Sequence, residues 1–112
     1  MNDCLFCKII AGDIPSNKVY EDEKCLAFYD IDPQAPVHFL VIPKEHIPSC
    51  AAVTAENAAV VAHLFEVIAK VTRELGVSEF RVVSNCGESA GQSVPHLHFH
   101  VLSGRDMTWP PG

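Results

Sequence analysis

The chain of 112 residues is 48% hydrophobic, which suits one ordinary core and bounds it to a single domain over residues 1–112. Its formal charge is −6 and its eight Lys and Arg form no basic run, so it lacks the charge pattern of a protein that binds nucleic acid polymers. No apolar run approaches the roughly 20 residues of a membrane span, and the first residues do not read as a signal peptide. Five cysteines, an odd number, indicate reduced thiols, and we expect a cytoplasmic protein with no membrane attachment.

The first predicted elements are a short helix and a series of strands. The segment LFCKIIAGD, residues 5–13, predicts a short helix that ends near Gly12. Runs rich in apolar, β-branched and aromatic residues, bounded by prolines or glycines, predict strands. These runs cover residues 25–31, 37–43, 80–85 and 96–102, with a short fifth run around Val19.

One long helix is predicted from Ala55 to Leu75. Thr54 is its expected N-cap, Glu56 lies in its first turn and Gly76 is its expected C-terminal cap. Its apolar residues recur at three- and four-residue steps and form one face: Val60, Val61, Leu64, Phe65, Ile68, Val71 and Leu75. Strand runs segregated from the helices predict an α+β domain with a mostly antiparallel five-stranded sheet, one long helix and one short helix.

Three of the six histidines alternate with apolar residues in the segment PHLHFHVL. In a strand, His96, His98 and His100 share one face, while Leu97 and Phe99 point into the core. Three interpretations fit this pattern: polar outward positions, a shared metal ion, or covalent chemistry. A single ion is disfavoured because the outer pair would lie about 13 Å apart along a straight strand, whereas zinc binds nitrogen at about 2.1 Å.

Covalent chemistry at a phosphate is the interpretation that the pattern favours. A neutral imidazole attacks phosphorus through one nitrogen while the other keeps its proton. Neighbouring histidines can fix the tautomer and donate to phosphate oxygens. The preceding loop, SNCGESAGQSVPH, carries two glycines and three serines and can turn backbone N–H groups toward an anion.

Cys4 and Cys7 have the C-x-x-C spacing of many zinc sites. By itself this pair also fits a redox motif or two buried thiols on a helix.

The motif HLHFHVL resembles the His-φ-His-φ-His-φ-φ signature of the histidine triad (HIT) superfamily, where φ is apolar. The segments FYDIDPQAPVHFLVIPKEHI, GQSVPHLHFHVL and WPPG resemble its Hint branch, the purine nucleoside phosphoramidases. The resemblance covers essentially the whole chain. It implies a homodimeric HIT-like fold and hydrolysis of the P–N bond of purine nucleoside 5′-phosphoramidates such as AMP-NH2 and AMP-lysine. Aminoacyl-adenylates are further implied substrates. The implied intermediate is a covalent nucleotidyl-histidine, and the chemistry requires no cofactor.

The same resemblance implies roles for individual residues. His98 matches the nucleophile, His96 a residue that orients its neighbours, His100 a phosphate contact and His38 a fourth catalytic histidine; Ser93 matches a serine near the leaving group. The implied nucleotide-binding residues are Leu5, Phe6, Ile9, Phe28, Asp30, Asn85, Gly91, Gln92, Ser93, His98 and His100. By residue type alone, the apolar members also fit a plain core, and Asp30 also fits a turn cap.

Relatives that carry the cysteine pair complete a tetrahedral zinc site with two histidines. Those histidines correspond to His46 and His96, so the resemblance implies a structural zinc on Cys4, Cys7, His46 and His96. Such a site would attach the triad segment to the N-terminal helix.

Two other functions remain open: hydrolysis of dinucleoside polyphosphates, as in a sister branch, and a non-catalytic nucleotide- or zinc-binding regulatory module. The expected partners are small AMP or GMP conjugates and a second copy of the chain. Trp109, with little chain beyond it, is a candidate dimer anchor, so we expect the tail 103–112 at the dimer interface. Packing of Trp109 on its own subunit is the alternative.

Overall fold

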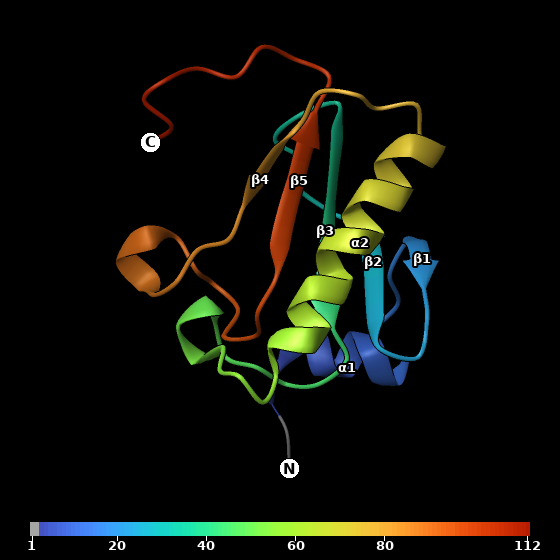
Figure 1. Cartoon of the computed structure of the whole chain (residues 1–112), viewed down its shortest axis with the longest axis vertical. Coiled ribbons are helices and arrows are strands. Elements are labelled where there is room, and N and C mark those ends of the chain that lie inside the picture. The colour runs from blue at the N-terminus through green and yellow to red at the C-terminus, as the bar shows by residue number, and fades with distance from the viewer. Residues whose placement is uncertain (1–2) are drawn as a thin grey trace.

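Two helices cover opposite faces of a five-stranded sheet in the computed structural model, which describes residues 3–112 (Figure 1). The strands lie in the order β1-β2-β3-β5-β4, and every neighbouring pair is antiparallel. The predicted α+β fold is therefore confirmed. The elements are α1 (Leu5–Ala11), β1 (Lys18–Glu21), β2 (Cys25–Tyr29), β3 (Val37–Pro43), α2 (Ala58–Glu74), β4 (Arg81–Val83) and β5 (Phe99–Ser103), with short 3₁₀ turns at Cys50–Ala52 and Glu88–Ala90.

Alternation along the central strands produces one apolar layer under each helix. The long helix α2 packs on the face that carries Phe39, Val41 and Val101, and the short helix α1 packs on the face that carries Leu40 and Ile42. Because neighbouring residues of a strand point to opposite faces, a nearly continuous apolar strand such as β3 serves both layers. His96 and His98 contact Phe6 on the α1 side, so the site lies on this side of the sheet.

The long helix begins three residues later than predicted, at Ala58. The Asn57 side-chain oxygen accepts the N–H of Thr54 at 2.7 Å, and the Thr54 hydroxyl accepts the N–H of Glu56 at 3.2 Å. These bonds close a separate turn, so Thr54 caps that turn and not the helix. The predicted apolar face is also too wide, because Phe65 is 48% exposed.

The triad segment enters the sheet later than the alternating pattern predicts. Strand β5 begins at Phe99, so His96 and His98 precede it and only His100 pairs within the sheet, opposite Leu40 of β3. The N–H of His96 donates to the carbonyl of Val94 at 2.8 Å, which closes a tight turn around Pro95. The alternation nevertheless continues through this turn, because Leu97 joins the core under α2 while His96 and His98 contact Phe6 of α1.

A partly buried carboxylate connects the β1–β2 turn to α2. Asp22 accepts hydrogen bonds from the His63 ring at 2.7 Å, the Tyr20 hydroxyl at 2.9 Å, and the backbone N–H groups of Lys24 and Cys25. Burial opposes its ionisation, but the hydrogen bonds outweigh burial and hold the pKa of Asp22 well below its usual range. The ionised carboxylate therefore fixes α2 against the hairpin.

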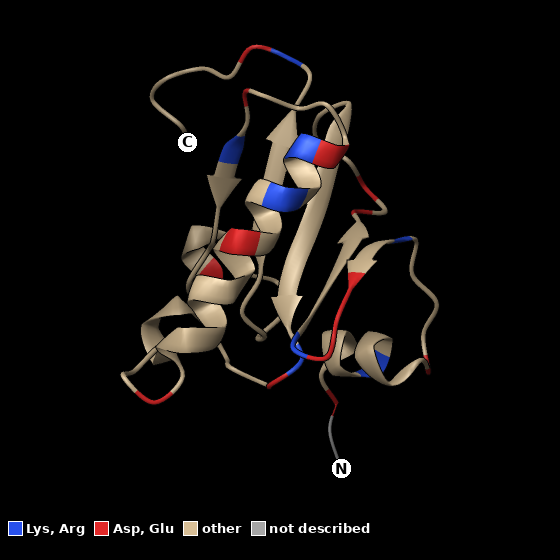
Figure 2. Cartoon of the chain, turned by 45° about the vertical axis from the view of Figure 1, so that its right-hand side comes forward, with Lys and Arg blue, Asp and Glu red and all other residues tan. Residues whose placement is uncertain are grey.

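Charged residues lie mainly on α2 and on the loops, while the sheet carries few of them (Figure 2). Within residues 3–112, none of the helices combines the length and apolar character needed to cross a membrane.

Candidate functional site

A cavity of about 220 Å³ opens between α1 and the face of the sheet that carries the histidines. It brings together eight of the residues predicted to bind a nucleotide: Leu5, Phe6, Ile9, Phe28, Asp30, Ser93, His98 and His100. Ile31, Leu40 and Val94 also line it and were missed. Leu40 has a recognisable signal, because it lies two residues from His38 on the same strand and therefore on the same face. Its lining combines apolar side chains with two imidazoles and a carboxylate.

His98 is buried, and its orientation is set by the backbone on either side. Its Nδ1 lies 2.7 Å from the carbonyl oxygen of His96, and because a carbonyl only accepts, Nδ1 carries the proton. The Ser84 hydroxyl in turn donates to the carbonyl of His98 at 2.9 Å. The edge of Phe6 packs against the ring at 5.0 Å between centroids. In the neutral form of the ring the lone pair is therefore on Nε2, and the ring lines the cavity.

His38 and His100 form a second, connected pair. His38 Nε2 lies 2.9 Å from His100 Nδ1, and the Asp30 carboxylate lies 3.4 Å from the same His38 nitrogen. Burial lowers the pKa of His38, and burial, with a smaller effect of His98 and His38, lowers the pKa of His100 to about 4. Both rings are therefore neutral at neutral pH. Sequence analysis predicted both residues but not their direct contact.

Asn85, Gly91 and Gln92 shape the loop before the triad and do not line the cavity. The Gln92 side chain accepts the N–H of Gly87 at 2.9 Å and donates to the carbonyls of Pro48 and Val94. Gly91 has a φ of +99°, and a Cβ there would lie 3.4 Å from the Asn85 amide nitrogen. Their predicted contact with a nucleotide stays a prediction. In the structure, the hydrogen bonds of Gln92 hold the loop in place.

Four side chains of types that can ligate a metal converge at the first histidine of the triad. The thiols of Cys4 and Cys7 and the Nδ1 atoms of His46 and His96 all lie within 4.8 Å of one another. His96 Nδ1 is 3.3 Å from Cys4 Sγ, 3.5 Å from Cys7 Sγ and 3.2 Å from His46 Nδ1. Tetrahedral zinc separates two nitrogens by roughly 3.3 Å and a nitrogen from a sulfur by roughly 3.6 Å, as its bond lengths require. The predicted donor set can therefore hold such a metal.

The outer contacts of these donors also fit a metal centre. His96 is fully buried and lies 2.9 Å through Nε2 from the carbonyl of Pro43, so its proton is on Nε2 and its Nδ1 lone pair faces the cluster. The N–H of Cys7 donates to Cys4 Sγ at 3.4 Å, an outer contact that orients this sulfur. Both ring nitrogens of His96 are therefore engaged away from the cavity, and this residue touches His98 through its carbonyl.

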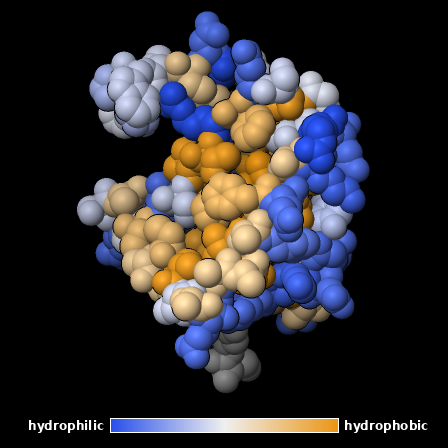
Figure 3. Space-filling model, in the orientation of Figure 1, coloured by the Kyte–Doolittle hydropathy of each residue, from blue (hydrophilic) through white to orange (hydrophobic). Residues whose placement is uncertain are grey.

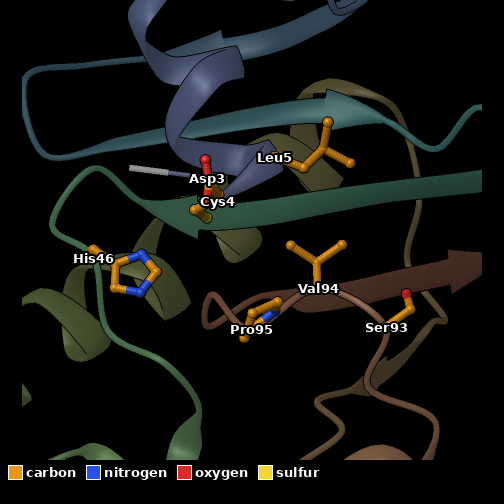
Figure 4. Close-up of a pocket in the computed structure, with 7 residues that line it drawn as sticks. All are labelled: Asp3, Cys4, Leu5, His46, Ser93, Val94 and Pro95. Carbon is orange, nitrogen blue, oxygen red and sulfur yellow. The ribbon is translucent and has the colours of Figure 1, made fainter. Parts of the chain in front are cut away.

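A second cleft, of about 440 Å³, runs from the cluster to the cavity (Figure 4). His46 and Cys4 line one part of it and Ser93 another, with Val94 and Leu5 between them (Figure 4). Leu5, Ser93 and Val94 line both the cleft and the cavity. The cleft beside Cys4 and His46 is therefore adjacent to the histidine-lined cavity.

The fold and the site together define a small α+β domain with a histidine-lined cavity on one face of its sheet. The family model of the HIT domain matches residues 11–107. The chain belongs to this family.

Similar proteins are known both as sequences and as solved structures. An uncharacterised HIT-like protein of Synechocystis is 50% identical over 111 residues, which cover 98% of this chain and 97% of that protein. The crystal structure of a HIT family hydrolase from Legionella pneumophila superposes with a TM-score of 0.95 at 46% identity, covering 98% of this chain and all of that one. A HIT family hydrolase from Clostridium thermocellum follows with a TM-score of 0.93 at 44% identity, covering 96% of each chain.

Proposed function

We propose that this protein is a hydrolase of the Hint type that cleaves the P–N bond of purine nucleoside 5′-phosphoramidates. The observation that carries the proposal is the orientation of His98, whose Nδ1 proton is held by the His96 carbonyl while Nε2 is left to react. Related solved structures that are named HIT family hydrolases support the reaction class.

Each part of the cavity has a task in this reaction. The purine lies against the apolar side chains of Phe6 and Phe28, and Asp30 accepts hydrogen bonds from the ribose hydroxyls. His98 Nε2 attacks phosphorus and forms an N–P bond while the P–N bond to the amine breaks on the side of Ser93. The departing nitrogen takes up a proton from solvent and leaves as the free amine. His100 donates to a phosphate oxygen as negative charge develops there. Water then hydrolyses the nucleotidyl-histidine and releases the nucleoside monophosphate.

We assign the four-donor cluster to a structural zinc ion. Cys4, Cys7, His46 and His96 would hold it, and a closed Cys₂His₂ set leaves no open position for substrate or water. Its contribution is to fix the turn that presents the His96 carbonyl to His98. The chemistry at phosphorus needs no cofactor. Thiolate ligands require reduced cysteines, which agrees with the predicted cytoplasmic location.

The decisive experiment is to trap the intermediate. Incubation with AMP-lysine followed by an alkaline quench is expected to leave AMP attached to the peptide that contains His98, because the N–P bond of a phosphohistidine survives base. Mass spectrometry locates the adduct. Turnover of diadenosine tetraphosphate is measured beside AMP-lysine. Faster hydrolysis of the dinucleotide would favour the sister branch, and the absence of turnover and adduct with both would favour a non-catalytic module.

We also propose that the single domain 1–112 forms a homodimer through its C-terminal tail. Trp109 is 82% exposed, and Arg81 donates to the carbonyl of Thr108 at 3.1 Å, which holds the tail beside β4. Apolar side chains gather on the face of the molecule that Figure 3 shows, and Phe65 and Phe80 are among the exposed large apolar residues. An exposed aromatic residue next to an apolar surface is typical of an interface.

Removing the tail tests the dimer. The full chain is expected to sediment as a dimer, and a chain that ends at Met107 as a monomer, because the truncation deletes Trp109 from the interface. Sedimentation velocity at several concentrations measures this. A dimer that survives the truncation unchanged would remove the tail from the interface, and a monomeric full chain would remove the dimer.

A further inference from the structure

We propose that Arg105 and the backbone of Gln34 are positioning groups that fix the tautomers of His38 and His100, so that His100 presents an N–H to the substrate phosphate. The catalytic consequence rests on the proposed function, whereas the tautomers themselves follow from the hydrogen bonds alone.

A continuous series of hydrogen bonds runs from the C-terminal segment to the cavity. Arg105 Nε donates to the carbonyl of Gln34 at 2.9 Å. The N–H of Gln34 donates to His38 Nδ1 at 3.0 Å. His38 Nε2 lies 2.9 Å from His100 Nδ1, and His100 lines the cavity. Each member is therefore held by the one before it.

The direction of the series follows from its first ring contact. A backbone N–H can only donate, so His38 Nδ1 must accept. The proton of neutral His38 is then on Nε2, where it donates to His100 Nδ1. Since Nδ1 of His100 accepts, the proton of neutral His100 is on its own Nε2. Burial lowers the pKa of both rings and so keeps them neutral.

The opposite tautomer would leave His100 unable to assist the reaction. If His38 carried its proton on Nδ1, its Nε2 would accept, and His100 would have to donate from Nδ1. His100 Nε2 would then direct a lone pair at a phosphate oxygen that also only accepts. A stabilising charge-assisted hydrogen bond would become a repulsive contact. The identity of one backbone donor thus decides whether His100 can bind phosphate.

The start of the C-terminal segment is built to hold this turn. Gly104 has a φ of +97°, and a Cβ there would lie 2.8 Å from Cβ of Pro36, so the chain packs directly on the turn that contains Gln34. Arg105 is the next residue and adds its hydrogen bond at this point of contact. The Gln34 side chain also donates to the Asp32 carbonyl at 2.9 Å, which closes the turn from the other side. Gln34 is therefore held in place from both sides.

The tautomers are measured directly by ¹⁵N NMR of the imidazole rings in protein labelled at histidine. In the native protein, His38 and His100 are both expected with the proton on Nε2 and Nδ1 unprotonated. Arg105→Met is expected to give a mixture of tautomers at His100 and to lower kcat for AMP-lysine about 10-fold, the worth of one net hydrogen bond, with KM nearly unchanged. Arg105→Lys, which keeps a donor, is expected to restore most of kcat.

Arg73→Met is the control, because Arg73 is an exposed arginine in the last turn of α2 and lies outside the series and the tail. It is expected to change neither the tautomers nor kcat. A proton on Nδ1 of His100 in the native protein would overturn the proposal, and so would an Arg105→Met variant with native tautomers and native kcat. If His100 shows the expected tautomer but no nucleotide is turned over, the proposed function fails and the tautomer assignment stands.

Discussion

Replacing His98 by alanine is expected to lower kcat for AMP-lysine by about 10⁴-fold or more, because no neighbouring ring can replace its nucleophilic nitrogen. Both nitrogens of His96 are engaged, one at the carbonyl of Pro43 and one in the four-donor cluster. His100 accepts at Nδ1 from His38 and carries a proton on Nε2. The rate of AMP release measures the loss, and the same variant should show no covalent adduct.

The control separates loss of the nucleophile from loss of the fold. His63→Ala removes a histidine on α2 that lies outside both the cavity and the cluster, so it is expected to keep native kcat at a temperature where circular dichroism shows it folded. The His98→Ala variant is expected to bind AMP, because the substitution leaves Phe6, Phe28 and Asp30 of the cavity unchanged. Turnover by His98→Ala within 100-fold of the native rate, or an adduct on another histidine, would contradict the assignment.

Local patterns were sufficient for most of the fold. The strand Val37–Pro43 has the predicted bounds because prolines limit the run on both sides. The alternation of histidines with Leu97 and Phe99 correctly separated the core face from the histidine face. Where local hydrogen bonds compete with helix or sheet, the predicted bounds were wrong. A side-chain bond of Asn57 closes a separate turn before α2, and a backbone bond closes the turn around Pro95 before β5.

The connections within the site could not be obtained from the same patterns. The two predicted histidines His38 and His100 are 62 residues apart in the sequence. Only the pairing of β3 with β5 brings His38 Nε2 to within 2.9 Å of His100 Nδ1. Their tautomers depend on the N–H of Gln34, a backbone group that no residue-type pattern reveals. The role of Gln92 in bracing the loop likewise depends on the Pro48 carbonyl, far away in sequence. Residue types predicted which side chains belong to the site, whereas the tertiary structure determines which atoms donate and which accept hydrogen bonds.

Removing the metal-binding capacity is expected to destabilise the protein strongly. A Cys7→Ser variant should lose the roughly one zinc ion per chain expected for native protein and unfold about 10 °C lower or more, since metal binding to a folded site contributes directly to folding stability. Zinc content by atomic absorption and Tm by calorimetry measure these effects. A strong chelator added to native protein is expected to lower the Tm by a similar amount.

The matched control is Cys86→Ser, which replaces an exposed cysteine outside the cluster and is expected to keep both zinc and Tm. Native protein that takes up less than about a tenth of an equivalent of zinc under reducing conditions would contradict the metal assignment. Catalysis provides a further consequence, because the cluster holds His96 and the His96 carbonyl holds the Nδ1 proton of His98. Loss of metal should therefore lower kcat even at temperatures where the variant remains folded, whereas a cluster that only stabilised the fold would leave kcat unchanged.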